Sequence, residues 1–182
     1  MSKKQMNASV KSIVVLLAIC LVVAVAMAAI HQVTAPKIEE ASRKAEQEAL
    51  RAVLSEATEF LPVEGEYAPS VSALYRDAGG AGYAVLLSAK GYDASNPIKL
   101  AAGFDADGKI LCLSVISCSG ETSGIGTKVA GEDFLSSFVG KDQTLAGVDA
   151  ISGATISSSA VLRAVAEGAK AVESVIASEV VS

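Results

Sequence analysis

Tryptophan is absent from this sequence, histidine occurs once and cysteine three times among 182 residues. A histidine-rich metal site is therefore excluded, and the sequence contains neither a Cys-x-x-Cys-His haem motif nor a ferredoxin-type cysteine set. Cys112 and Cys118 would lie roughly 20 Å apart in one extended strand, far beyond the reach of a disulfide. A disulfide would need a sharp turn between them, so we expect free thiols and no disulfide framework.

Acidic residues are missing from the first thirty positions, which contain Lys3, Lys4 and Lys11. The whole chain has a formal net charge of −5, and these lysines contribute +3, which leaves −8 for the remainder. An acidic region with scattered Lys and Arg lacks the basic patch that nucleic acid requires. We therefore expect no nucleic-acid partner.

An unbroken apolar run covers residues 13–30 and gives about 27 Å of helix, enough to cross a bilayer. The lysines before it place the N-terminus in the cytoplasm and the remainder outside. A cleaved signal peptide with its cleavage site at residues 26–28 would usually have a shorter apolar core. In a lipoprotein with lipid on Cys20, the residue before this cysteine should be small, whereas Ile19 is bulky. We favour a retained single-pass anchor in the cell inner (cytoplasmic) membrane, in contact with lipid.

Small and apolar residues recur on one helical face between residues 36 and 57, and Pro36 suits the first turn of a helix. This pattern predicts an amphipathic helix that links the membrane to a folded domain, with a spacer role favoured over a partner-binding one. The predicted organisation is a cytoplasmic N-terminus (1–11), a transmembrane anchor (12–30), a linking segment (31–59) and one domain (60–182).

Short segments after residue 60 have the period of β-strands. Residues 83–88 are one candidate, and residues 98–104 and 109–117 flank a hairpin signal at 105–108, where Gly108 can adopt positive φ. Both faces of the 109–117 strand are apolar, which predicts a central strand covered on both sides.

A stripe of apolar residues with helical spacing and a serine-rich first turn predict a final helix over residues 157–179. Helices at both ends with strands between them indicate an α+β fold with a mainly antiparallel sheet. The complete prediction is an N-terminal transmembrane helix followed by a single domain with flanking helices.

A segment of small residues, 149–159, opens onto this final helix. Backbone N–H groups and the helix dipole favour a phosphate at a helix N-terminus. Thr155 lies just before the predicted helix, and Gly153 and Ala154 leave its hydroxyl accessible. An ordinary Ser/Thr cap with a flexible turn before it would have the same composition.

The sequence Asp-Ala-Ile-Ser-Gly-Ala-Thr at residues 149–155 resembles the acceptor motif of covalent flavoproteins: Asp, two residues, Ser or Thr, then Gly-Ala-Thr. In that family a Mg-dependent flavin transferase transfers FMN from FAD to the threonine. The resemblance implies that FMN is joined through its phosphate to Thr155, which is a substrate of this modification and not a catalytic residue. The residues implied to position Thr155 or to be recognised by the transferase are Asp149, Ser152, Gly153 and Ala154.

Residues 120–128, Gly-Glu-Thr-Ser-Gly-Ile-Gly-Thr-Lys, resemble the Glu-Thr-Pro-Gly-Leu-Gly loop of the FMN-binding domain in Rnf and Nqr respiratory complexes. We call this segment the glycine loop. Ser123 stands where the family has proline, and Cys118-Ser119 stands where a histidine is common. A glycine-rich surface loop is the structural alternative. The resemblance implies cofactor contacts for Glu121, whose charge would help to set the flavin potential, and for Thr122, Gly124 and Gly126.

The pair Gly91-Tyr92 also fits this family. The resemblance covers nearly the whole chain. The compact length of the chain favours the G-type flavoprotein of Rnf over the longer C-type flavoprotein of Nqr. The resemblance implies an electron-carrier subunit, not catalytic alone, of a membrane-bound ferredoxin:NAD oxidoreductase that transports Na⁺ or H⁺. Its FMN domain would be extracytoplasmic, and its partners would be the other Rnf subunits. The alternatives are the C-type flavoprotein of Nqr, a membrane-tethered binding domain without flavin, and a free-standing flavin reductase.

Overall fold

The computed structural model describes the backbone of residues 3–181 and the side chains of residues 10–179. The side chains of Lys3 and Lys4 lie outside the described residues, whereas Lys11 is exposed. The chain divides into two compact units, Met1–Lys44 and Ala45–Ser182. The second unit begins earlier than the predicted domain, because the end of the first helix packs on the sheet.

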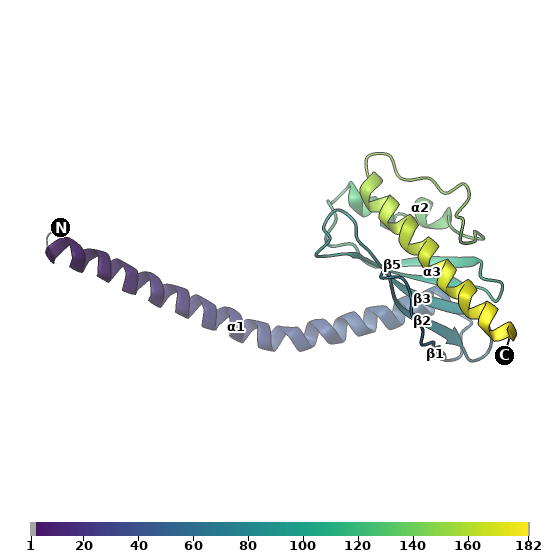
Figure 1. Ribbon diagram of the computed structural model, residues 1–182, viewed down its shortest axis with the longest axis horizontal. Helices are drawn as coiled ribbons and strands as arrows, with labels where there is room; N and C mark the ends of the chain where they lie inside the picture. Colours follow the sequence, from purple (N-terminus) through teal and green to yellow (C-terminus); the bar gives the residue numbers. More distant parts are fainter. Residues whose placement is uncertain (1–2, 182) are drawn as a thin grey trace. The chain divides into compact units, whose positions relative to one another are not determined.

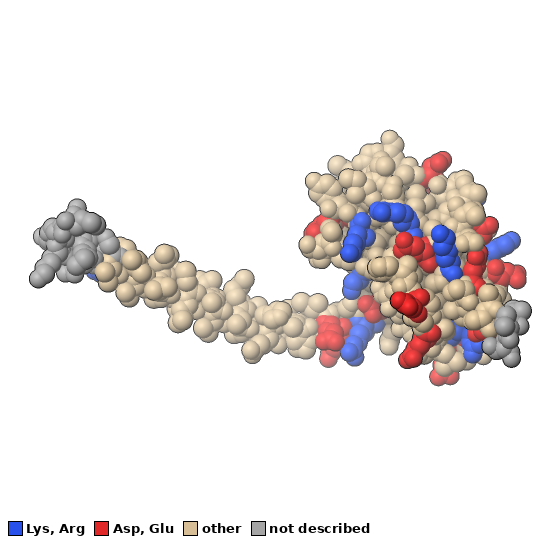
Figure 2. Space-filling model, in the orientation of Figure 1, with Lys and Arg blue, Asp and Glu red and all other residues tan. Residues whose placement is uncertain are grey.

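Helix α1 is continuous from Lys3 to Val53. Residues 12–30 and 36–57 were predicted as separate helices, but Pro36 lies inside α1 and does not interrupt it. Proline removes only the hydrogen bond to the carbonyl of Gln32, and the strong helix formers that follow continue the helix. Part of the span Val10–Val53 is long and apolar enough to cross a membrane by length and composition. In Figure 2 this part is a long stretch without basic or acidic side chains.

The five strands form one antiparallel sheet in which each strand pairs with the next in the sequence (Figure 1). The α+β fold with an antiparallel sheet is therefore confirmed. The short strand β1 and the partly polar β2 were not predicted. The elements after α1 are β1 Phe60–Pro62, β2 Val71–Asp77, β3 Tyr83–Ala89, β4 Ile98–Phe104, β5 Ile110–Ser117, the 3₁₀ helix η1 Gly126–Ala130, α2 Glu132–Ser136 and α3 Thr155–Val181.

Helix α3 crosses one face of the sheet (Figure 1) and confirms the predicted final helix. Its fully buried Val161, Val165 and Val172 lie in the same core as alternate residues of β3 and β4. Burial of each such side chain stabilises the fold by about 1.5–3 kcal/mol. This packing fixes the position of α3, and its first turn therefore has a defined place at one end of the sheet.

The last turns of α1 cover the opposite face of the sheet. Ala49, Leu50 and Val53 lie in one cluster with small and apolar residues of β3 and β4. A Cβ at Gly103 of β4 would overlap the backbone of Val53, so glycine permits this close approach. The helix predicted as a linker is therefore, at its C-terminal end, part of the core of the domain.

Strand β5 lies at the edge of the sheet, and its prediction as a central strand was wrong. Leu111 and Cys112 are exposed. Phe104 pairs with Ile110 and Gly103 with Cys112, so Leu111 is an extra residue at a β-bulge. The bulge shifts the alternation by one, which places both Ile110 and Leu113 in the same core cluster as the buried residues of α3. The strands with buried residues on both faces are β3 and β4, in which Lys99 is the one exposed residue.

The predicted hairpin between β4 and β5 is confirmed. The Asp105 carboxylate accepts hydrogen bonds from the N–H groups of Asp107 and Lys109 at 3.0 and 2.8 Å, and Gly108 has φ +79°. Cys112, exposed, and Cys118, partly buried, are free thiols.

Candidate functional site

A cleft of about 440 Å³ lies where three segments of the domain meet. The segments are the stretch after β3, the glycine loop and the first turn of α3. Its volume is within the range of about 300–1,000 Å³ that small-molecule sites occupy. Parts of the two motifs that the sequence resemblance selected thus lie at one cleft. The lining residues are Tyr92, Glu121, Thr122, Ile125, Gly126, Gly153, Ala154, Thr155, Ile156 and Ser157.

Thr155 is the first residue of α3, and its side chain is exposed at the cleft. Within residues 10–179 its hydroxyl has no hydrogen-bond partner. Gly153 has φ +80°, a conformation that glycine adopts without strain, and it reverses the chain just before the helix. The Ala154 N–H donates to the Ile151 carbonyl at 3.0 Å and closes this turn. The local geometry therefore presents the Thr155 hydroxyl to solvent.

Ser158 holds the turn before α3 and was not singled out by the sequence analysis. Its buried hydroxyl accepts from the N–H of Ile151 at 3.0 Å and donates to the carbonyl of Ala154 at 2.9 Å. The turn is therefore tied at both ends to one side chain of the helix that follows. The serine-rich first turn was the signal in the sequence.

The first turn of α3 has backbone donors without acceptors. The Ser158 N–H makes the first bond of the helix ladder, to the carbonyl of Ala154. The N–H groups of Thr155, Ile156 and Ser157 have no acceptor among the described residues. Such unpaired donors and the positive end of the helix dipole favour an anion. A phosphate attached to Thr155 would lie close to these donors.

Glu121 has a buried carboxylate that connects the three segments of the cleft. One oxygen, Oε1, accepts from the backbone N–H of Tyr92 at 3.0 Å, and the other, Oε2, accepts from the hydroxyl of Ser157. Tyr92 follows β3, and Ser157 lies in the first turn of α3. Both carboxylate oxygens are thus hydrogen-bonded within the protein.

The remainder of the glycine loop is a tight turn that leads into η1. The Thr122 carbonyl accepts from the N–H groups of Ile125 and Gly126 at 3.1 and 2.8 Å. Gly124 has φ +75° and donates its N–H to the hydroxyl of Thr127 at 2.9 Å. These bonds close the turn although Ser123 replaces the proline of the family. Gly124 shapes the loop but does not line the cleft.

Two residues of the acceptor motif lie outside the cleft. Asp149 is exposed and lines a second cavity of about 560 Å³, together with residues of η1, α2 and the loops around them. Ser152 is exposed and lines neither cavity. The structure therefore brings Gly153, Ala154 and Thr155 together with the glycine loop, but leaves Asp149 and Ser152 on the adjoining surface.

Three large side chains at the cleft are unusually exposed. Tyr92, Ile125 and Ile156 have exposed fractions of 71%, 50% and 59%. From the sequence, Tyr92 was noted only as part of a Gly-Tyr pair, and the two isoleucines were not singled out. The sequence signal that could have identified these three residues is that each is a single large side chain within a segment of otherwise small and polar residues. Together they give the cleft an apolar surface that a flat ring can contact.

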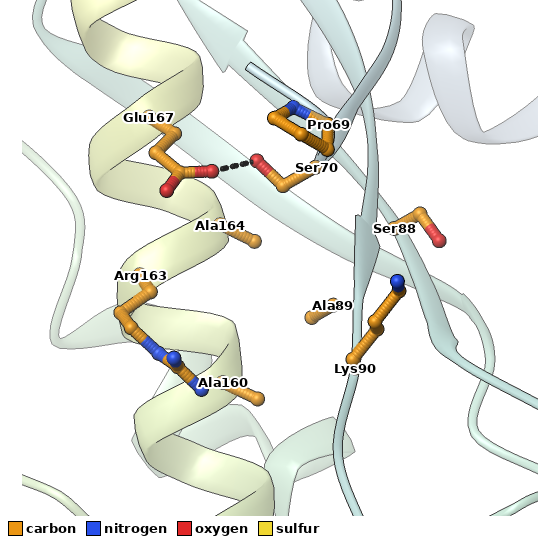
Figure 3. A pocket seen from close by; sticks show the side chains of 9 residues that line it. All are labelled: Pro69, Ser70, Ser88, Ala89, Lys90, Ala160, Arg163, Ala164 and Glu167. Atoms are coloured by element: carbon orange, nitrogen blue, oxygen red, sulfur yellow. Dashed lines mark hydrogen bonds between the residues drawn. The ribbon is translucent and has the colours of Figure 1, made fainter. Parts of the chain in front are cut away.

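A third cavity, of about 190 Å³, lies between α3 and the end of β3 and shares no residue with the cleft. Figure 3 shows Ser70 and Glu167 joined there by a hydrogen bond, with Arg163 and Lys90 at its sides. On the face of the domain seen in Figure 2, basic and acidic side chains are interspersed. This face therefore has no large field of one sign.

Comparison with known families defines the class of the protein. Residues 91–170, which include the glycine loop and the turn before α3, match the model of the FMN-binding domain family. Residues 1–53 match that of the RnfG N-terminal region. The cleft thus belongs to an FMN-binding domain that follows an apolar N-terminal helix.

Two similar proteins are G subunits of ion-translocating or proton-translocating oxidoreductase complexes. The G subunit of the proton-translocating ferredoxin:NAD(+) oxidoreductase complex of Clostridium ljungdahlii is 27% identical over 163 residues, which are 84% of this chain and 85% of that protein. The G subunit of the ion-translocating oxidoreductase complex of Methanosarcina acetivorans is 30% identical over 167 residues, or 85% and 89% of the two chains. This chain belongs to the RnfG family of such G subunits.

Proposed function

We propose that this chain is the electron-carrier subunit of a membrane-bound, ion-translocating ferredoxin:NAD oxidoreductase, with FMN joined by a phosphoester to Thr155. The observation that carries the proposal is the shared cleft, in which the glycine loop faces a turn that exposes the Thr155 hydroxyl. The names of the two relatives support the place of the chain in a complex of several subunits.

The residues at the cleft fit the parts of FMN. The unpaired N–H groups of Thr155, Ile156 and Ser157 suit its phosphate. Tyr92 and Ile125 offer apolar surface to the ring system, and the exposed Thr122 offers a hydroxyl to its polar edge. When bound, FMN supplies the capacity to accept and release electrons, and the protein holds and orients it.

Attachment of FMN is a transfer of a phosphoryl group from FAD. The Thr155 oxygen forms a bond to the phosphorus on the FMN side, and the bond from that phosphorus to the bridging oxygen breaks. AMP leaves with the bridging oxygen, and the hydroxyl proton passes to a base of the transferase. The exposure of Thr155 supports access by a separate Mg-dependent flavin transferase. The exposed Asp149 and Ser152 are suited to recognition by that enzyme.

A covalent link has a clear advantage on the outer side of the membrane, because a dissociated cofactor would diffuse away. The lysines before the apolar run and the absence of acidic residues among the first thirty positions support a cytoplasmic N-terminus. We assign residues 1–11 to the cytoplasm and 12–30 to the lipid-embedded anchor. The link of residues 31–59 and the FMN domain of 60–182 lie outside, and the link from Ala45 on belongs to the same compact unit as the domain. A C-terminal reporter that works only outside the cytoplasm should be active, and N-terminal sequencing that begins near Ala29 would instead show cleavage.

Attachment is tested on protein purified from its native membrane. The intact mass should exceed the mass of the polypeptide by FMN minus water, and denatured protein should fluoresce on a gel under ultraviolet light. Thr155→Val keeps the size of the side chain and removes the hydroxyl, so both signals should disappear. Ser136→Ala, which removes an exposed hydroxyl of α2 outside both the cleft and the acceptor motif, is the control for the site. Covalent flavin that persists in Thr155→Val would refute the assignment.

A further inference from the structure

We propose that Glu121 and Ser157 form a positioning pair that holds the Thr155 hydroxyl in the orientation in which it accepts FMN. This inference rests on the proposed attachment at Thr155. It assigns to Glu121, which lines the cleft, the role of connecting the walls of the cleft. It also assigns a role to Ser157, a residue of α3 that lies outside the acceptor motif.

The Glu121 carboxylate reaches two different walls of the cleft. Its Oε1 accepts from the N–H of Tyr92, and its Oε2 accepts from the hydroxyl of Ser157. Glu121 is 7% exposed and Ser157 is 4% exposed, so both bonds are shielded from water. Hydrogen bonds to a charged group are worth about twice neutral ones. A single side chain therefore sets the distance between the stretch after β3 and the start of α3.

Two glycines make room for this carboxylate. A Cβ at Gly91 would overlap Oε1 of Glu121, and a Cβ at Gly126 would lie 2.5 Å from Oε2 and 3.0 Å from the Ser157 hydroxyl oxygen. Neither glycine has positive φ. Glycine is therefore required at positions 91 and 126 because it leaves space for the Glu121 carboxylate, and not because of its conformational freedom.

The hydrogen bond from Ser157 to Glu121 also fixes the backbone of Thr155, because Ser157 and Thr155 share the first turn of α3. Ser158 ties the turn to its own segment, whereas Ser157 makes the one hydrogen bond, among the described residues, between this turn and the glycine loop. Since the Thr155 hydroxyl has no partner of its own there, its orientation relative to the cleft depends on the backbone of the turn. Group transfer is sensitive to such placement, and an error of about 1 Å can reduce a rate roughly a hundredfold.

The third cavity supplies a matched control. There the Ser70 hydroxyl donates to the Glu167 carboxylate of α3 (Figure 3), so Ser70→Ala removes the same kind of bond from the same helix but away from the cleft. Glu121→Gln is the conservative variant. Its amide can accept from the Tyr92 N–H and donate to the Ser157 hydroxyl, so it preserves both connections.

The experiment measures the rate of FMN attachment to the full-length, unmodified chain in detergent, with flavin transferase, FAD and Mg²⁺. Covalent fluorescence is followed with time, and all variants are assayed well below their measured unfolding temperatures. We expect Ser157→Ala and Glu121→Ala to lower the maximal rate at saturating acceptor at least tenfold. Ser70→Ala and Glu121→Gln should remain within about threefold of the wild type.

The outcomes distinguish failure of the positioning role from failure of the attachment itself. Attachment to Ser157→Ala at the wild-type rate overturns the positioning role, as does an equal loss in Ser70→Ala. If Glu121→Ala does not fold, the Ser157→Ala and Ser70→Ala pair still decides the question. Loss of attachment in Glu121→Gln equal to that in Glu121→Ala would also contradict the proposal, because Gln keeps the connections. Failure of the wild type to become labelled, or labelling of Thr155→Val, would instead refute the attachment on which the inference rests.

Discussion

Two buried carboxylates join separate segments of this domain, Asp77 at the turn between β2 and β3 and Glu121 at the cleft. Asp77 is 2% exposed and accepts from the N–H groups of Thr58, Glu59 and Ala81. Its bonds close the turn between β2 and β3 and tie this turn to the segment before β1. Glu121 accepts from segments that are distant in the sequence and leaves an open cleft above it. Hydrogen bonds to a buried carboxylate can therefore either close a turn, as at Asp77, or connect the walls of a cleft, as at Glu121.

The largest expected effect concerns only the cleft. In native membranes, Thr155→Val should reduce ferredoxin-to-NAD electron transfer to background, because the proposed carrier lacks its FMN. Asp77→Asn, at growth temperatures where the chain stays folded, should leave the specific rate per folded complex unchanged. The rate is measured in membranes together with the amount of assembled protein. Wild-type transfer in Thr155→Val membranes would contradict the role of attached FMN.

Substitution of the glycine beside each carboxylate sharpens the comparison. A Cβ at Gly126 would lie 2.5 Å from Glu121 Oε2, and one at Gly79 would lie 2.9 Å from Asp77 Oδ2. Overpacking of this kind usually costs about 1–3 kcal/mol, so both Gly126→Ala and Gly79→Ala should lower the unfolding temperature. Only Gly126→Ala should also slow FMN attachment. Equal effects of the two variants on attachment would remove the distinction between the sites.

The acid sensitivity of the fold should depend on Asp77. Hydrogen bonds from the backbone N–H groups, that of Ala81 first and then those of Glu59 and Thr58, hold the pKa of Asp77 well below its usual range. A lowered pKa in the folded state means that the stabilisation is present above the unfolded pKa of about 3.9 and is lost as pH falls below it.

Thermal unfolding from pH 7 to pH 2 checks this expectation. Asp77→Asn should be less stable than the wild type at pH 7, and the difference between their unfolding temperatures should shrink below about pH 4. A difference that stays constant over this range would show that Asp77 acts only through packing.

The smallest expected effect is electrostatic. Glu121→Gln removes one negative charge near the cleft while its amide keeps the hydrogen bonds, so the midpoint potential of attached FMN should rise. A charge several ångströms away across a partly screened path is worth about 1 kcal/mol at most, which corresponds to a shift of tens of millivolts. Redox titration of the labelled protein measures this shift. Glu121→Gln should slow electron transfer only modestly, and a potential that does not move would place the charge too far from the flavin to matter.

Local patterns were sufficient to predict the final helix, the hairpin at residues 105–108 and strands β3 and β4, because apolar periodicity and turn residues act over short distances. The same patterns failed for β5. Its apolar residues on both faces indicated a central strand, whereas the bulge at Leu111 and its place at the edge depend on pairing with β4. Pro36 was interpreted as a helix start, but it lies inside α1, where the surrounding helix formers tolerate the loss of one backbone hydrogen bond.

The sequence by itself determined two components of the site, an exposed threonine after Gly-Ala and a glycine-rich loop with one acidic residue. It also determined, apart from the site, an apolar helix at the N-terminus. Each of these is a property of neighbouring residues. Only the tertiary structure decided that Gly91, Glu121 and Ser157 meet in one place and that Asp149 lies in a different cavity. The physical reason is that packing of α3 across the sheet brings distant segments together, and a buried carboxylate then requires hydrogen-bond donors from whichever segments surround it.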